Sequence, residues 1–424
     1  MTRELAVEVI RDPSHGFTGV PSQRAGSPAA DEIVAELMVK LFRSGPGLSI
    51  LAVTPGTPAT GVTTWKEARL EVTAQELLDR ADRLRTIWHD QVVEHRVSEA
   101  GHGLRVGDPL TKLADLTEHS TLVDPLVAKL ADEGFDLLHL MLGGDGYDLG
   151  HVRDFLLGAL SGEQELRVSF HSEWQLPWPM LAVDPAECDS PWQAFLGHRH
   201  QLEQADPRHS WDHAPLGRRE RATTSLNKDT GLDHVSRAHE VEKLLEERSL
   251  LTVRTSGGEL LEALSRSVLH EDVMYFWCHG RFVRTGEAGE FMAIQLSDTE
   301  DIDGPVVARK RRSYVRSPWA RFKPFVLLNA CQSGKAAAPG RLKHLGQELI
   351  DQGADGVLAP QIDMPEGFAA EYAYAFLERY LSSGHTAGEI GRFLVRRFAR
   401  EFNNPLALAY SLKCGLNARL NLDS

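Results

Sequence analysis

The chain has few cysteines, which excludes a fold built on disulfide bonds. Its 424 residues include 4 cysteines, at positions 188, 278, 331 and 414, and no two of them form a Cys-x-x-Cys pair. Small secreted scaffolds need a much denser cysteine framework, and structural zinc sites usually need ligands in close pairs. The sequence therefore predicts reduced thiols in an intracellular, cytoplasmic protein.

Long apolar runs and nucleotide-binding motifs are also absent. No stretch approaches the roughly 20 apolar residues of a membrane span, and the charged N-terminus lacks the apolar core of a signal peptide. The Gly-Lys-Ser/Thr of a P-loop does not occur, and the glycines at 143–146 do not fit a dinucleotide fingerprint. With a net charge of −14, the surface should repel nucleic acid and anionic lipid. We expect no cofactor, no membrane association and no direct binding of nucleic acid.

Helix and strand patterns alternate along most of the chain, which predicts an α/β protein. Hydrophobic residues make up 42% of the sequence and charged residues 25%, as in ordinary globular proteins. We predict strands over 166–170, 250–255, 273–278, 325–330, 356–360 and 406–413, and helices over 238–248, 258–269, 341–352, 366–382 and 387–402. This spacing is typical of βαβ units, so the predicted fold is a doubly wound, mostly parallel sheet with helices on both faces.

The first 110 residues are predicted to be a distinct N-terminal α/β region with an accessory or docking role. Residues 1–28 are rich in Gly, Pro, Ser and Arg and should form a tail or an irregular edge. Beyond the tail we predict helices over 31–42, 73–93 and 124–132, and strands over 48–53 and 135–142. The second domain is predicted over 111–424, with its α/β core from about 165 and a polar linker or long loop at about 200–235.

Two of the predicted strands end at reactive side chains. One is followed by His279 and Gly280, and the other by Ala330 and Cys331. In an open parallel sheet, catalytic groups collect at the carboxyl ends of the strands. A cysteine thiol beside a histidine base is the pair that nucleophilic cysteine enzymes use. We therefore predict Cys331 as the nucleophile and His279 as the general base.

Small residues beside this pair favour an oxyanion hole made of backbone N–H groups. Gly280 follows the histidine and Ala330 precedes the cysteine, so the backbone can approach a substrate carbonyl closely. We predict the N–H groups of Gly280 and Cys331 as the oxyanion donors. Cys278 should point to the opposite face of its strand from His279 and belong to the core.

These motifs resemble the CHAT family of caspase-like cysteine peptidases, of clan CD. The specific part is Asn329-Ala330-Cys331-Gln332-Ser333-Gly334, together with His-Gly at the end of an earlier strand. Segments 176–181, 353–359 and 404–410 also resemble that family, so the resemblance spans about 110–424. It implies a caspase–haemoglobinase fold with a caspase-like sheet, in which His279 is the base and Cys331 the nucleophile. It further implies activation by a partner protein or a ligand, and a role in prokaryotic defence or regulated cell death.

The chain differs from the family after the strand that follows the nucleophile. Relatives often carry Asp there, whereas this chain has Asp363-Met364-Pro365-Glu366. Asp363 and Glu366 are therefore candidate residues of the substrate pocket, where an inward carboxylate would favour a basic substrate side chain. The alternative for Asp363 is a solvated loop carboxylate.

Two further clusters have a structural and a functional interpretation. The histidines at 198, 200, 209 and 213 are dense enough for a metal site, but a polar linker supplies no supporting partners for ligands, so we predict no metal. The basic run 309–312 is interpreted as a solvated loop, with a cleavable activation loop as its functional alternative.

The predicted function is that of an intracellular cysteine endopeptidase that cleaves a protein partner through a His–Cys dyad and responds to a regulatory protein or ligand. One alternative is a catalytically silent scaffold or binding module with the caspase fold. Another is a thiol hydrolase or acyltransferase that uses the same dyad on a non-peptide substrate.

Overall fold

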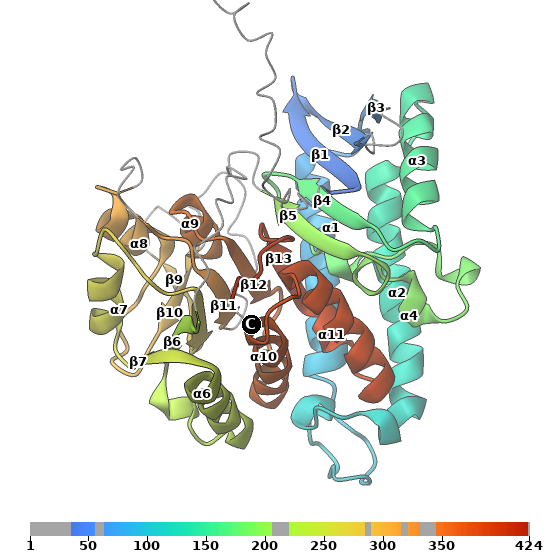
Figure 1. Cartoon of the computed structure of the whole chain (residues 1–424). Helices are drawn as coiled ribbons and strands as arrows, with labels where there is room; N and C mark the ends of the chain where they lie inside the picture. The colour runs from blue at the N-terminus through green and yellow to red at the C-terminus, as the bar shows by residue number, and fades with distance from the viewer. Residues whose placement is uncertain are drawn as a thin grey trace, which may run out of the picture. The chain divides into compact units, whose positions relative to one another are not determined.

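An 11-stranded mixed β-sheet runs through the computed structural model (Figure 1). The strand order is β3-β2-β1-β4-β5-β13-β12-β11-β8-β6-β7. Neighbouring strands are parallel except for the pairs β1–β2, β2–β3 and β12–β13. This mostly parallel sheet with flanking helices confirms the predicted α/β class.

The structure describes residues 35–55, 63–205, 220–284, 290–314, 321–330 and 345–422, all of which belong to a unit that begins at Ala35. The strands are β1 (Leu37–Ser44), β2 (Gly47–Thr54), β3 (Thr64–Arg69), β4 (Arg167–His171), β5 (Gln201–Ala205), β6 (Ala222–Lys228), β7 (Ser249–Arg254), β8 (Val273–Trp277), β9 (His279–Arg284), β10 (Glu290–Gln295), β11 (Phe325–Asn329), β12 (Gly356–Pro360) and β13 (Tyr410–Lys413).

The α-helices are α1 (Ala74–Trp88), α2 (Ser120–Leu142), α3 (Tyr147–Leu160), α4 (Pro191–Ala194), α5 (Leu196–Arg199), α6 (Ser236–Arg248), α7 (Gly257–Leu264), α8 (Gly304–Arg311), α9 (Leu345–Asp351), α10 (Glu366–Leu381) and α11 (Ala387–Glu401). Shorter turns include a π-helical η2 (His89–Val93) and the 3₁₀ segments η3 (Leu110–Lys112), η4 (Thr117–His119), η5 (Trp178–Met180), η6 (Pro185–Glu187), η7 (Thr230–Leu232) and η9 (Pro405–Ala409).

The strands and helices around the two motifs confirm the βαβ prediction. Strands β8, β11 and β12 and helices α6, α10 and α11 lie within a residue or two of the expected ranges. The strand predicted over 406–413 begins instead with the 3₁₀ turn η9, because the Asn404 side chain accepts a hydrogen bond from the N–H of Leu406 at 3.0 Å.

The helix predicted over 31–42 is wrong where the structure describes it. Residues 37–44 form β1, in which Leu37, Val39 and Leu41 are buried at every second position. That period of two fits a strand. Strand β1 pairs with β4, so β1, β2 and β3 from the predicted N-terminal region extend the same sheet as the later strands. An accessory or docking role for residues 1–110 stays a prediction.

The strand predicted over 135–142 is also wrong. These residues continue α2, which runs unbroken from Ser120 to Leu142. Leu137, Leu138, Met141 and Leu142 are buried at helical spacing. A short apolar run is compatible with a buried strand or with one side of a helix. Here the run directly follows helical turns, and the helix continues through it.

The polar stretch predicted as a linker contains two buried strands, β5 and β6. Their polar side chains bond to one another and to neighbouring strands. The Thr224 and Ser249 hydroxyls lie 2.5 Å apart, and the Asn227 amide donates to the Tyr275 carbonyl at 3.3 Å. Polar groups can be buried when they have such partners. The low hydrophobicity of β5 and β6 therefore did not correspond to a loop.

Two apolar layers cover the central strands, as the alternation of their side chains requires. Tyr275, Leu327 and Leu358 pack on the side of α6 and α10. Met274, Val326 and Val357 face the other way, toward α7, α8 and α9. Cys278 belongs to this second layer with 3% of its surface exposed, which confirms it as a core residue.

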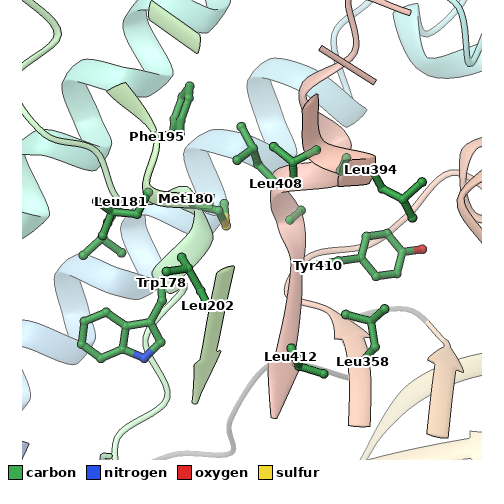
Figure 2. Packing of buried hydrophobic residues seen from close by; sticks show 14 of the residues in the cluster. Trp178, Met180, Leu181, Phe195, Leu202, Leu358, Leu394, Leu408, Tyr410 and Leu412 are labelled. Carbon is green, nitrogen blue, oxygen red and sulfur yellow. The ribbon is translucent and has the colours of Figure 1, made fainter. Parts of the chain in front are cut away.

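A further part of the core joins segments that are distant in sequence. Figure 2 shows Trp178 and Met180 of η5 in one apolar cluster with Leu202 of β5, Leu408 of η9 and Tyr410 of β13. The Trp178 ring stacks on Phe170, with 3.8 Å between the ring centroids. The turn around Leu-Pro-Trp is thus a packing element.

The basic run 309–312 does not form the predicted loop. Three of its residues end helix α8. The buried Arg311 donates to the Leu264 carbonyl at 2.9 Å and stacks on Phe322, with its guanidinium carbon 4.3 Å from the ring centroid. A helix held in this way does not support the alternative of a cleavable activation loop.

Candidate active site

The two strands that end in the predicted motifs are neighbours in the sheet. Strands β8 and β11 are parallel, and their register pairs Trp277 with Asn329. The two strand ends that carry the motifs therefore lie side by side. Cys331 lies outside the described residues, so its pairing with His279 stays a prediction.

A cavity of about 440 Å³ opens at these strand ends. Its wall is formed by the end of β8, the end of β11, the start of α10 and the short turns η3 and η7. The lining residues are Pro109, Thr111, Lys112, Leu232, Trp277, Cys278, His279, Asn329, Ala330, Met364, Pro365, Glu366, Gly367 and Ala369. His279 and Ala330, the residue bonded to Cys331, thus share one cavity.

The imidazole of His279 is half exposed and has a carboxylate close by. Its side chain is 53% exposed, and its Nε2 lies 3.7 Å from Oδ2 of Asp229, a distance for an ion pair and not for a hydrogen bond. Asp229 is fixed from both sides: its N–H donates to the Trp277 carbonyl at 2.9 Å, and its Oδ1 accepts from the N–H of Gly231 at 2.9 Å. The carboxylate therefore has a defined position beside the ring.

Asn329, the first residue of the Asn-Ala-Cys motif, joins three elements. Its amide nitrogen donates to the Ala369 carbonyl in α10 at 2.8 Å, and its Oδ1 accepts from the Tyr410 hydroxyl at 2.6 Å. Because both ends of the buried amide are bonded, the end of β11 is held against α10 and β13. The Asn329 residue is 5% exposed and ties the last residue of β11 to both neighbouring elements.

Gly280 lies in a second, two-stranded sheet. Strands β9 and β10 form it, with Gly280 opposite Ile294. Next to the glycine, Arg281 donates to both carboxylate oxygens of Asp301, at 2.8 and 2.5 Å. The oxyanion role of the Gly280 and Cys331 N–H groups stays a prediction.

The two acidic candidates for a substrate pocket lie in different surroundings. Glu366 lines the cavity, and its Oε2 is 2.9 Å from His234 Nε2. The pKa of His234 is raised above its usual value, first by its hydrogen bond to the Gly231 carbonyl and then by the charge of Glu366. Asp363 is not one of the lining residues, and its Oδ2 lies 3.7 Å from Nε2 of His89.

Within the described ranges, no cluster of three or more His, Cys, Asp or Glu side chains is able to hold a metal ion. His198 and His200 are buried, and burial lowers the pKa of each to about 4. In His200, Nε2 donates to the Leu160 carbonyl and Nδ1 accepts from the Leu166 N–H. His209 and His213 lie outside the described residues.

The sequence analysis missed Asp229, Leu232 and Lys112 as residues near the site. Asp229 directly follows β6, whose polar sequence was interpreted as a linker. An acidic residue at the end of a strand was the available signal, but it required that strand to be recognised. Lys112 lines the cavity and also pairs with Asp108, with 2.7 Å from its Nζ to Oδ2.

Comparison with known proteins finds no matching family model and no matching curated protein. Similar solved structures include two of the Saccharomyces cerevisiae separase–securin complex, at 11% identity and a TM-score of 0.44, which cover 92% and 89% of this chain. The chain spans 30% of the length of each matched chain in those complexes. The Arg-specific cysteine proteinase gingipain R matches at 10% identity and a TM-score of 0.38, covering 82% of this chain and 75% of its own. TM-scores of this size do not define a common fold, so the fold class rests on the strand order itself.

A membrane-crossing helix is not found: none of the helices in the described ranges is both long enough and apolar enough.

Proposed function

We propose that this protein is a caspase-like cysteine endopeptidase of the CHAT type, with Cys331 as nucleophile and His279 as general base. One observation carries the proposal. The adjacent parallel strands β8 and β11 end at the same cavity, which His279 and Ala330 both line. Because Cys331 is bonded to Ala330, this arrangement supports a thiol at the same opening as the imidazole.

In the proposed reaction, His279 takes the proton of the Cys331 thiol while the sulfur forms a bond to the carbonyl carbon of a peptide. With Nε2 turned toward Asp229, Nδ1 is the ring nitrogen left for this proton. The negative charge on the carbonyl oxygen is stabilised by the N–H groups of Gly280 and Cys331. His279 then protonates the leaving amine, and water hydrolyses the thioester to release the acid and restore the thiol.

Asp229 is a positioning residue in this scheme. A carboxylate 3.7 Å from Nε2 favours one orientation of the ring and stabilises the positive charge that the imidazole carries between the two proton transfers. The N–H of Asp229 bonds to the carbonyl of Trp277, two residues before His279, and this bond keeps the carboxylate close to the base.

Labelling with a peptide-based electrophile tests the catalytic assignment. We expect wild type to be labelled at Cys331, and Cys331→Ala and His279→Ala to lose the label. Cys188→Ala is the matched control, since Cys188 is a half-buried cysteine whose thiol has a pKa raised by burial. Persistence of the label in Cys331→Ala would refute the enzyme assignment. Labelling of Cys331 no faster than that of a small peptide thiol would favour a silent scaffold.

We also propose that activity depends on a partner protein or ligand and serves defence or regulated cell death. The support is the resemblance of the motifs to the CHAT family. Incubation of wild type and Cys331→Ala with the products of neighbouring genes tests this. A partner polypeptide cut by wild type and left intact by the variant is expected, and identical fragments from both would refute it. A substrate screen that includes esters and thioesters distinguishes a peptidase from another thiol hydrolase.

A further inference from the structure

Helix α11 carries a row of three arginines on the side that faces away from the core. Arg392, Arg396 and Arg400 are four residues apart, so they lie one turn after another along the same side of the helix. The opposite side packs into the core with residues such as Leu394 and Phe398. We call these three residues the α11 arginine row. None of them was a predicted site residue, and none lines the cavity at the ends of β8 and β11.

Two members of the row have no carboxylate partner. Arg400 is exposed and Arg396 is half-buried, and neither has an ion pair with a carboxylate of the described ranges. The Nε of Arg396 is covered by protein, so its terminal nitrogens are the donors left for a ligand. Arg392 differs, because it pairs with Glu165 at 2.5 Å and donates to the Arg199 carbonyl at 2.9 Å.

The surroundings of the row are positively charged. His198 belongs to α5, which packs against α11. Burial is the first cause that lowers the pKa of His198 to about 4, and the charges of Arg396, Arg400, Arg392 and Arg199 follow in this order. Arg199 donates mainly to main-chain carbonyls. Within the described ranges, four guanidinium groups therefore share a single carboxylate partner, the one paired with Arg392.

An acidic peptide segment fits this surface in charge and in spacing. A negative partner is complementary to uncompensated arginines. Successive arginines of the row are about 6 Å apart along the helix axis. In an extended peptide, side chains two residues apart point to the same side and are about 6.6–6.8 Å apart. Carboxylates at alternate positions of such a peptide can therefore each pair with one arginine.

Net charge favours a short peptide over a nucleic acid. The chain carries a net charge of −14, which repels a long polyanion at a distance. A segment with two or three carboxylates is repelled much less, because the repulsion grows with the charge of the partner. Such a segment gains the same contacts at the row.

We propose that the α11 arginine row binds an extended acidic segment of a partner protein. Arg396 and Arg400 each bind one carboxylate, at alternate positions of the segment, and Arg392 adds positive charge at the end of the row. This surface is separate from the proposed dyad, so the proposal holds whether or not Cys331 is a nucleophile.

Isothermal titration of the full chain with synthetic peptides tests the proposal. The probe is a peptide of four Glu-Ser repeats, whose carboxylates fall at alternate positions. We expect a dissociation constant of about 1 mM or lower at an ionic strength of about 0.05 M, rising about threefold or more at about 0.5 M because salt screens exposed charges. A peptide of four Gln-Ser repeats should bind about tenfold more weakly or worse. Four glutamates followed by four serines should bind about threefold more weakly, since adjacent side chains point to opposite sides.

Charge-removing variants locate the binding surface. The double variant Arg396→Gln with Arg400→Gln should weaken binding of the Glu-Ser peptide by about tenfold or more, because two charge-assisted contacts are lost. Arg397→Gln is the matched control in the same helix. Arg397 pairs with Glu401 at 2.9 Å and lies off the row, so this variant should bind within about twofold of wild type. Melting temperatures within a few degrees of wild type would show that lost binding is not lost folding.

Four outcomes would overturn the proposal. The first is no binding of the Glu-Ser peptide up to about 10 mM, well above the range of weak specific sites. The second is equal binding of the Gln-Ser peptide, and the third is unchanged affinity in the double variant. The fourth is tighter binding by a single-stranded oligonucleotide that the double variant abolishes, which would make the row a nucleic-acid surface.

Discussion

His279 and Asp229 lie 3.7 Å apart, measured from Nε2 to Oδ2, although α6, β7, α7 and β8 separate them in the chain. The contact exists because β6 and β8 are parallel neighbours and the N–H of Asp229 bonds to the Trp277 carbonyl. The imidazole at the cavity therefore has a fixed acidic neighbour.

Replacing Asp229 by Asn should slow the reaction of Cys331. The amide keeps an oxygen for the Gly231 N–H but removes the charge beside the imidazole, so we expect the rate of labelling by a peptide electrophile to fall about tenfold or more. Asp233→Asn is the control, because Asp233 follows the same strand but pairs with Lys228 at 3.1 Å. Equal rates in Asp229→Asn and wild type would show that the carboxylate has no role in positioning the base.

Removing the Tyr410 hydroxyl should loosen the nucleophile motif. Tyr410→Phe deletes the bond to Asn329 Oδ1 and leaves a buried amide oxygen without that donor. We expect the free energy of unfolding, measured by urea titration, to fall by about 1–2 kcal/mol, with slower labelling of Cys331. Tyr374→Phe should be close to neutral, because the Tyr374 hydroxyl makes no hydrogen bond within the described residues. A neutral Tyr410→Phe would contradict the bonding seen here.

The buried histidines predict loss of stability in mild acid. The pKa of His198 and of His200 falls from 6.5 to about 4 on folding, chiefly because burial disfavours the charged ring. Between these values the unfolded chain binds protons that the folded chain does not, so stability is full above pH 6.5 and falls as the pH drops toward 4. From pH 7 to pH 5 each histidine should cost about 2 kcal/mol.

The variant His200→Gln isolates one of these contributions. Gln does not titrate, so the difference in unfolding free energy between pH 7 and pH 5 should shrink by about 2 kcal/mol relative to wild type. The exposed His139, replaced by Gln, serves as the control and should leave the pH dependence unchanged. A full wild-type pH dependence in His200→Gln would mean that other groups cause it.

Two glycine-to-alanine substitutions in helices should have opposite signs. At Gly134 of α2, an added Cβ would lie 2.4 Å from the Met180 carbonyl oxygen, so Gly134→Ala should separate α2 from η5 and lower the unfolding free energy by about 1–3 kcal/mol. At Gly391 of α11 nothing lies within 4 Å of such an atom, and Gly391→Ala should stabilise by up to about 1 kcal/mol. Stabilisation by both variants would show that α2 and η5 are not in tight contact.

The sequence by itself determined the α/β class and the strands that carry the motifs. Runs such as Phe325–Asn329 are apolar on both faces, and only a strand covered by helices on both sides accommodates them. The placement of His279 and Ala330 at the ends of strands followed from the same runs. These features can be recognised locally, because hydrophobic periodicity is a property of short runs of consecutive residues.

Only the tertiary structure decided the rest. Strands β5 and β6 are polar, and their burial depends on partners such as Ser249 and Tyr275 that lie far along the chain. The position of Asp229 beside the imidazole likewise depends on which strands become neighbours. Hydrogen bonds and charge pairs form between residues that folding brings together. The distances between such residues cannot be recognised from local patterns in the sequence.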